Sequence, residues 1–146
     1  MAGGSVPISG ERMCAARLLA DTFDVRDPTI LALLWELGAG ARTSAARLAA
    51  TVGLRSRFAL SRLLTRNQLP TLTDLRGCLR VLRWLRTWET ERVPLSHQAL
   101  SNGEDPAAWY RTVKRVTGRD WAEIRRIGTK AAAAELRERF VRGSAT

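Results

Sequence analysis

The sequence has few of the residues from which catalytic and metal-binding sites are built. Its 146 residues include one histidine, His97, and two cysteines, Cys14 and Cys78. The cysteines lie far apart and match no metal-binding or redox spacing, so we expect reduced thiols. No glycine-rich phosphate loop and no Cys–His pairing occurs in the sequence. These absences predict a protein that is not an enzyme and that binds neither a metal nor a cofactor.

Long apolar runs and strand patterns are also missing. The longest apolar stretch, "ILALLW" at residues 30–35, is far too short to span a bilayer. The first twenty residues lack a charged segment followed by a long apolar run, so we expect no signal peptide and a cytoplasmic protein without membrane contact. There is no alternation of Val, Ile and Thr and no Asn-Gly hairpin. The sequence therefore predicts an all-α fold.

Positive charge is abundant and unevenly placed. The chain carries 24 Lys and Arg against 14 Asp and Glu, a net charge of +10. Residues 1–41 carry a net charge of −2, residues 42–126 carry +10, and the remainder carries +2. A basic domain attracts polyanions, and this distribution favours nucleic-acid binding by the middle and later chain. A merely solubilising surface is the alternative.

Signals for helix starts recur along the chain. An Asp that can cap a helix, followed by a Pro suited to its first position, occurs at 27–28 and at 105–106. Capping-box spacing occurs in "TLTD" (71–74) and "DWAE" (120–123), and Ser44 and Ser96 are expected N-caps. With glycines near the expected helix ends, these signals predict helices over residues 11–22, 28–38, 44–52, 56–67, 72–89, 96–102, 106–117 and 120–127, and a final helix over 129–141.

The helix expected over residues 72–89 differs from an ordinary surface helix. Its apolar residues cover well over half of the circumference, whereas a surface helix shows a narrower stripe. We therefore expect it to be buried on two sides, as a strut between two units, with Gly77 as a weak point in it. The arginines on its remaining strip are Arg76, Arg80 and Arg83, of which we expect Arg80 to pair with a carboxylate. We also expect four tryptophans in the core, namely Trp35, Trp84, Trp88 and Trp121.

Two similar segments flank this strut. The first is "TSAARLAATVGLRSRFALSRLLTRN" and the second is "PLSHQALSNGEDPAAWYRTVKRVTG". In each, a short helix carries an alanine (Ala49, Ala99), a glycine follows four residues later (Gly53, Gly103), and a second helix carries arginine. Two short helices joined by a glycine-containing turn are typical of a helix-turn-helix unit.

In these features the chain resembles the DNA-binding domain of the AraC/XylS family of bacterial transcription regulators. The matching motifs are "LAATVG" (48–53), "LSRLL" (60–64), "LRVLRWL" (79–85) and "WYRTVKRVTGRDWAEIRR" (109–126). The resemblance implies two helix-turn-helix subdomains joined by a long shared linker helix. The chain departs from the family pattern in Trp84, which stands at a small position of the linker helix, and around Leu69–Pro70, where a glycine is expected.

The resemblance divides the chain into five parts. These are a leader and accessory helix (1–27), a first helix-turn-helix lobe (28–70), the linker helix (71–90), a second lobe (91–128), and a C-terminal helix and tail (129–146). It implies a sequence-specific regulator that binds double-stranded DNA, resembling the stand-alone members that bind as monomers. Both recognition helices would then enter successive major grooves.

The expected DNA contacts of the first lobe lie on the helix over residues 56–67. Arginine can bridge O6 and N7 of guanine, so we expect Arg57, Ser61 and Arg62 to reach base edges, with Arg62 the strongest. Phosphate contact or solvation is the alternative for each. Phe58 could meet a thymine methyl group or belong to the core. The complete expected set is Arg55, Arg57, Phe58, Ser61, Arg62 and Thr65.

The second lobe has fewer residues suited to reading bases. Alanines stand near the start of its second helix, so we expect Arg111 and Lys114 to grip phosphates, while Trp109 and Val113 fill the core. The complete expected set is Ala107, Ala108, Tyr110, Arg111, Lys114 and Arg115.

Two alternatives remain open. The domain could be an adaptor or anti-regulator that docks on RNA polymerase or another regulator, or it could bind nucleic acid without sequence preference.

Overall fold

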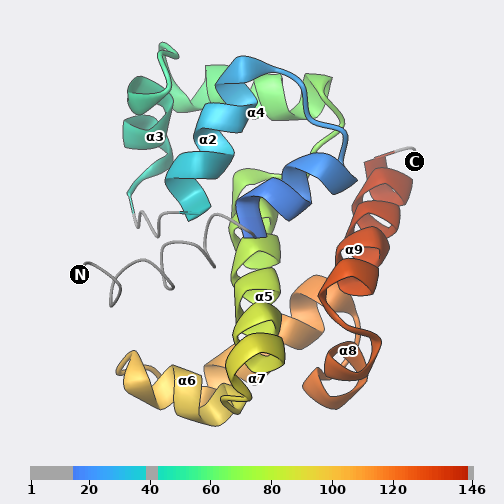
Figure 1. The fold of residues 1–146 in the computed structure, drawn as a ribbon. Helices are drawn as coiled ribbons and strands as arrows, with labels where there is room; N and C mark the ends of the chain where they lie inside the picture. Colours follow the sequence, from blue (N-terminus) through green and yellow to red (C-terminus); the bar gives the residue numbers. More distant parts are fainter. Residues whose placement is uncertain (1–14, 39–42, 145–146) are drawn as a thin grey trace, which may run out of the picture.

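The computed structural model of the chain describes residues 15–38 and 43–144. Within these ranges the chain forms helices joined by short turns, and no strand occurs in them. The all-α prediction is confirmed. Figure 1 shows one long helix running through the molecule, with shorter helices gathered at each of its ends.

Helix boundaries follow the local signals closely. A first helix covers residues 15–22. It is followed by α2 (Pro28–Gly38), α3 (Ala45–Thr51), α4 (Arg57–Arg66), α5 (Leu72–Glu91), α6 (Leu95–Ser101), α7 (Pro106–Thr117), α8 (Trp121–Ile127) and α9 (Thr129–Ser144). Most of these ends differ from the predicted ones by one or two residues, which is ordinary for helices that fray. Helix α9 extends three residues past its predicted end, and residues 11–14 of the first predicted helix lie outside the described residues.

Side-chain caps explain most of the helix starts. Asp105 accepts a hydrogen bond from the Ala107 N–H at 3.1 Å, and Pro106 fills the first position of α7. Asp120 and Glu123 form a complete capping box at the start of α8. These contacts satisfy backbone donors that have no partner inside the helix.

The predicted cap at Ser96 is wrong. Helix α6 begins one residue earlier, at Leu95, which is fully buried, and Pro94 takes the N-cap position without a side-chain hydrogen bond. Proline has a fixed φ and lacks an N–H, so it precedes a helix at little cost. Ser96 is therefore inside the first turn, where its hydroxyl is no longer placed to cap the helix.

Helix α5 is the strut of the fold. It contacts α2, α6, α7 and α9, and Figure 1 shows α2, α3 and α4 at one end and α6, α7 and α8 at the other. Burial on more than one side is therefore confirmed. Packing explains why position 77 holds glycine, because a Cβ added there would lie 2.7 Å from Cγ2 of Val116. Its missing side chain allows α5 and α7 to approach closely.

The tryptophans divide between core and surface. Trp84 and Trp121 are buried, and Trp88 is half-buried against the core. The expectation for Trp35 is wrong, because this side chain is 49% exposed. Helix α2 buries residues at positions 30, 33, 34 and 37, one helical face. Trp35 follows Leu34 by one residue, a rotation of about 100°, and so leaves that face.

The thiol of Cys78 is free and buried in α5, while Cys14 lies outside the described residues. Burial, and next the nearby carboxylate of Asp74, raise the pKa of the Cys78 thiol to about 12. The thiolate is the reactive form of cysteine. Cys78 is therefore a structural residue of the core.

Candidate nucleic-acid interface

The helix pairs α3–α4 and α6–α7 share the backbone conformation and one hydrogen bond of their connecting turns, although the first turn is one residue longer. Their turns contain Gly53 at φ 84° and Gly103 at φ 70°, a region that strains side chains other than glycine. After each glycine, the next backbone N–H donates to the carbonyl of a fully buried alanine. The Leu54 N–H donates to Ala49 at 2.7 Å, and the Glu104 N–H donates to Ala99 at 3.0 Å. The two similar sequence segments therefore also share this backbone hydrogen bond.

The second helices of the pairs also correspond, position by position. Counted from its first residue, α4 buries its fourth and eighth residues, Leu60 and Leu64. The same positions of α7 hold Trp109 and Val113, also buried. Equal burial periodicity gives each helix an outward face at equivalent positions. The two faces therefore present Ser61, Arg62 and Thr65 on α4, and Tyr110, Arg111 and Lys114 on α7.

Every predicted contact of the first lobe is exposed on or beside α4. Arg62 makes no ion pair within the described chain, so its guanidinium is available to a ligand. Phe58 is 61% exposed, which excludes the core interpretation. The guanidinium of Arg57 lies 5.0 Å from the centroid of the Phe58 ring, a cation–π contact that holds the two side chains together.

The predicted contacts of the second lobe have differing surroundings. Ala107, Tyr110, Arg111 and Lys114 are exposed, whereas Ala108 is half-buried. Neither Arg111 nor Lys114 forms an ion pair with a described residue. Arg115 is different, because its Nη1 lies 3.4 Å from the Asp74 carboxylate in the first turn of α5. Arg115 thus joins α7 to α5, while its neighbours face outward.

The linker arginines take part in contacts between helices. Arg80 lies 3.9 Å from the carboxylate of Glu104, as expected, and 5.2 Å from the Trp84 ring centroid. Arg76 donates to the carbonyl of Thr43, and burial lowers its pKa. These guanidiniums tie α5 to the segments that precede α3 and α7.

Sequence reasoning did not find the contacts that attach α9. The Arg119 Nε donates to Glu135 at 2.7 Å, and Glu89 accepts hydrogen bonds from the Thr129 backbone N–H at 3.1 Å and from the Thr129 hydroxyl. These partners are far apart in the chain, so no local pattern signals them. Together they fix α9 against α5 and the turn before α8.

Helices α4 and α7 lie on the same side of the other helices that Figure 1 shows in front of them. In Figure 1, α4 passes behind α2 and α7 passes behind α5, so both helices lie toward the far side of that view. Helix α5 begins just after the turn that follows α4 and packs against α7, so it connects the two helices.

Other kinds of site find little support in the described ranges. No cluster of His, Cys, Asp and Glu there could hold a metal ion, and His97 is exposed. Among the helices described, none combines the length and apolar character needed to cross a bilayer.

Comparison with known proteins gives no relative from which a function could be transferred: no protein-family model, curated protein or solved structure matches the chain.

Proposed function

We propose that this protein is a sequence-specific DNA-binding transcriptional regulator of the AraC/XylS type. The observation that carries the proposal is the repeated glycine turn between two short helices, with exposed basic side chains on the second helix of each pair. Two short helices in this arrangement are the device by which many regulators place a helix in the major groove. The net charge of +10 supports the same conclusion, since phosphate contacts dominate affinity for DNA.

The two helices would have unequal roles. Helix α4 offers Arg62, which forms no ion pair within the described chain, together with Ser61 and the Arg57–Phe58 pair, and these groups suit contacts to guanine and to a thymine methyl. Helix α7 begins with Pro106 and alanines, which carry no hydrogen-bonding side chain. Its Arg111 and Lys114 would grip phosphates and position the protein. Sequence would be read mainly by the first lobe.

A monomer would suffice for binding. The strut α5 would hold α4 and α7 against one side of the duplex, roughly 34 Å or one helical turn apart, in successive major grooves. Fixed lobes at this spacing would bend the DNA, at a cost of the order of a few kcal/mol that further phosphate contacts offset.

Selection of bound duplexes from a random pool at physiological salt tests the proposal. We expect enrichment of two motifs one helical turn apart, with the stronger motif assigned to the first lobe by the Arg62→Ala variant. A single enriched motif would mean that only one of the two lobes recognises DNA sequence. A pool without any enriched motif would refute sequence-specific binding.

One observation favours a second candidate function, that of a protein-binding adaptor. Leu31 and Trp35 lie one turn apart on α2 and are 41% and 49% exposed. Large exposed apolar side chains that adjoin one another are typical of protein-binding surfaces. An adaptor that docks on RNA polymerase or another regulator would show no steep salt dependence on random duplex, whereas a DNA-binding protein would.

A further inference from the structure

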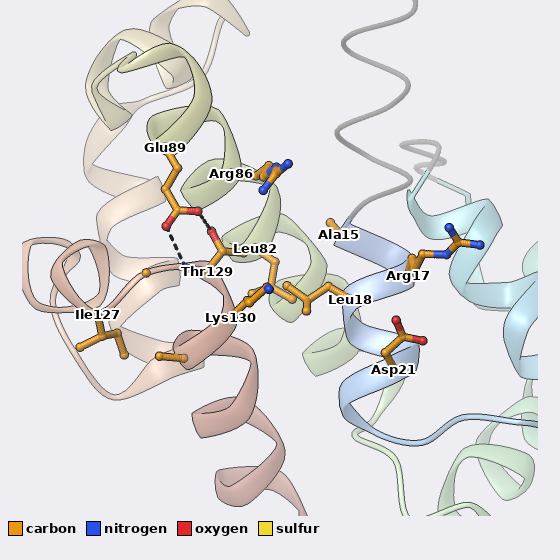
Figure 2. A pocket seen from close by; sticks show the side chains of 12 residues that line it. Ala15, Arg17, Leu18, Asp21, Leu82, Arg86, Glu89, Ile127, Thr129 and Lys130 are labelled. Carbon is orange, nitrogen blue, oxygen red and sulfur yellow. Dashed lines mark hydrogen bonds between the residues drawn. The ribbon is translucent and has the colours of Figure 1, made fainter.

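A cavity of about 470 Å³ lies between the first helix, α5 and the junction of α8 with α9 (Figure 2). Its volume is in the range of small-molecule sites. Apolar side chains form much of its wall, with Leu18 from the first helix, Leu82 from α5 and Ile127 from the end of α8. No residue of α4 or α7 lines it, so it is separate from the proposed DNA-binding faces.

Charged side chains border this apolar space. On the α5 and α9 side these are Arg86, Glu89 and Lys130. The Glu89 carboxylate already accepts hydrogen bonds from the backbone N–H and the hydroxyl of Thr129. Arg86 and Lys130 form no ion pair with any carboxylate of the described chain. Arg86 and Lys130 are exposed cations from different helices, and with Glu89 they give this border one more positive than negative group.

The first helix adds charges that offset one another. Arg17 and Asp21 both border the cavity and are one helical turn apart. Figure 2 shows Arg17 extending away from α5, and Leu18 facing the side on which Arg86 and Lys130 lie. Excess positive charge is thus placed at α5 and α9, and apolar surface is placed opposite.

We propose that this cavity binds a small amphipathic carboxylate. The apolar body of such a molecule would lie between Leu18, Leu82 and Ile127, and its carboxylate would accept hydrogen bonds from Arg86 and Lys130. Charge-assisted hydrogen bonds of this kind are stronger than neutral ones. A small inorganic anion would leave the apolar wall in water, and a neutral apolar molecule would leave both cations unpaired. This inference is independent of the proposed DNA binding.

Calorimetric titration of the full chain with decanoate tests the inference, with decanol and acetate as comparison probes. We expect one decanoate per chain, bound at least about tenfold more tightly than either comparison probe, a factor that corresponds to about 1.4 kcal/mol. The Arg86→Gln/Lys130→Gln variant should weaken decanoate binding by about tenfold or more. Ala131→Phe, which places a larger side chain on an exposed lining position of α9, should also weaken it.

The matched control is Arg126→Gln/Arg137→Gln, which removes two exposed cations from α8 and α9 outside this cavity. It should bind decanoate as the unmodified chain does. The inference is wrong if decanoate gives no saturable heat up to about 1 mM, if decanol binds as tightly, or if the two double variants bind alike. Melting curves of both variants verify that each remains folded.

Discussion

The indole rings of Trp84 on α5 and Trp109 on α7 stack, with centroids 4.1 Å apart and planes inclined by 11°. Both are buried, and neither indole N–H has an acceptor within the described chain. The stack fastens the outward-facing helix of the second lobe to the strut. It also gives the large Trp84 side chain a flat aromatic surface to pack against.

Replacing Trp84 should therefore be costly. Trp84→Ala should lower the free energy of unfolding by about 3–5 kcal/mol, the usual range for removing a buried aromatic side chain. Trp84→Phe should cost less, because the indole N–H that it removes has no partner to lose. Trp35→Ala is the matched control and should cost less than about 1 kcal/mol, since Trp35 is half-exposed. Urea unfolding measures all three, and equal losses at Trp84 and Trp35 would contradict the described packing.

Gly77→Ala should destabilise the protein although alanine is the better helix former. The gain from helix propensity is about 1 kcal/mol. The new Cβ would lie 2.7 Å from Cγ2 of Val116, and overpacking of this kind typically costs about 1–3 kcal/mol. Val116→Ala in the same chain should remove the clash and restore part of the stability. A double-mutant cycle by chemical denaturation measures the coupling, and additive effects would argue against a close crossing of α5 and α7.

Arg62→Ala and Lys114→Ala should affect DNA binding differently. If Arg62 reads a base, its loss should lower discrimination between specific and random duplex by about 1–3 kcal/mol. If Lys114 contacts phosphate, its loss should weaken all sequences alike and reduce the salt dependence. Competition binding at several salt concentrations distinguishes these results, with Arg137→Ala on α9 as a control for lost charge. Equal losses on both kinds of DNA for both variants would refute the division of roles between α4 and α7.

Gln68→Gly should stabilise the protein. Gln68 follows Asn67, the C-cap of α4, and has φ 58°. The next N–H, that of Leu69, donates to the Leu64 carbonyl at 3.0 Å, and this pattern usually has glycine at the position of Gln68. Glycine relieves the strain of the left-handed conformation but costs more backbone entropy on folding. The net increase in the free energy of unfolding should be about 0.5–1 kcal/mol. Thermal unfolding of Gln68→Gly and Gln68→Ala provides the test, because alanine keeps the Cβ and should give no such gain.

Cys78 should resist thiol reagents while the protein is folded. A Cys14→Ser variant leaves Cys78 as the only cysteine, and at pH 8 it should be labelled quickly only in denaturant. Because the pKa of the Cys78 thiol in the folded protein, about 12, lies above the ordinary value of 9.0, folding keeps the thiol protonated to higher pH. The stability that this pKa difference contributes is complete below about pH 9 and is lost as the pH rises toward 12. The Cys78→Ala variant should lose less stability between pH 9 and 12 than the unmodified protein. Fast labelling of the folded Cys14→Ser variant would contradict the buried position of Cys78.

The local chemistry of the chain predicted most of the fold. Asp105–Pro106 and the Asp120 capping box act on residues within one turn, so their effect could be deduced from neighbours alone. Ser96 shows the limit of such reasoning, since burial of Leu95 shifted the helix start by one residue. The outward position of Ser61, Arg62 and Arg111 also followed from periodicity, whereas Phe58 was left open and Ala108 is half-buried. Their role in DNA binding stays a prediction.

Partners that meet across the fold could not be deduced in this way. Arg111 and Arg115 are four residues apart and lie on the same face of a helical wheel, but only the packing of α7 on α5 brings Asp74 to Arg115. The same packing turned Gly77 from a weak point of the strut into the position that permits a close crossing.

By itself, the sequence determined the helices, most of their ends, the similar pairs of short helices and the basic character of the later chain, because each of these depends on residues within one or two turns. Only the tertiary structure decided that Trp84 stacks on Trp109, that Trp35 stays at the surface, and that a cavity bordered by Arg86 and Lys130 opens beside α5. Those outcomes depend on which faces of distant helices meet, and side-chain volume and charge in three dimensions settle that choice.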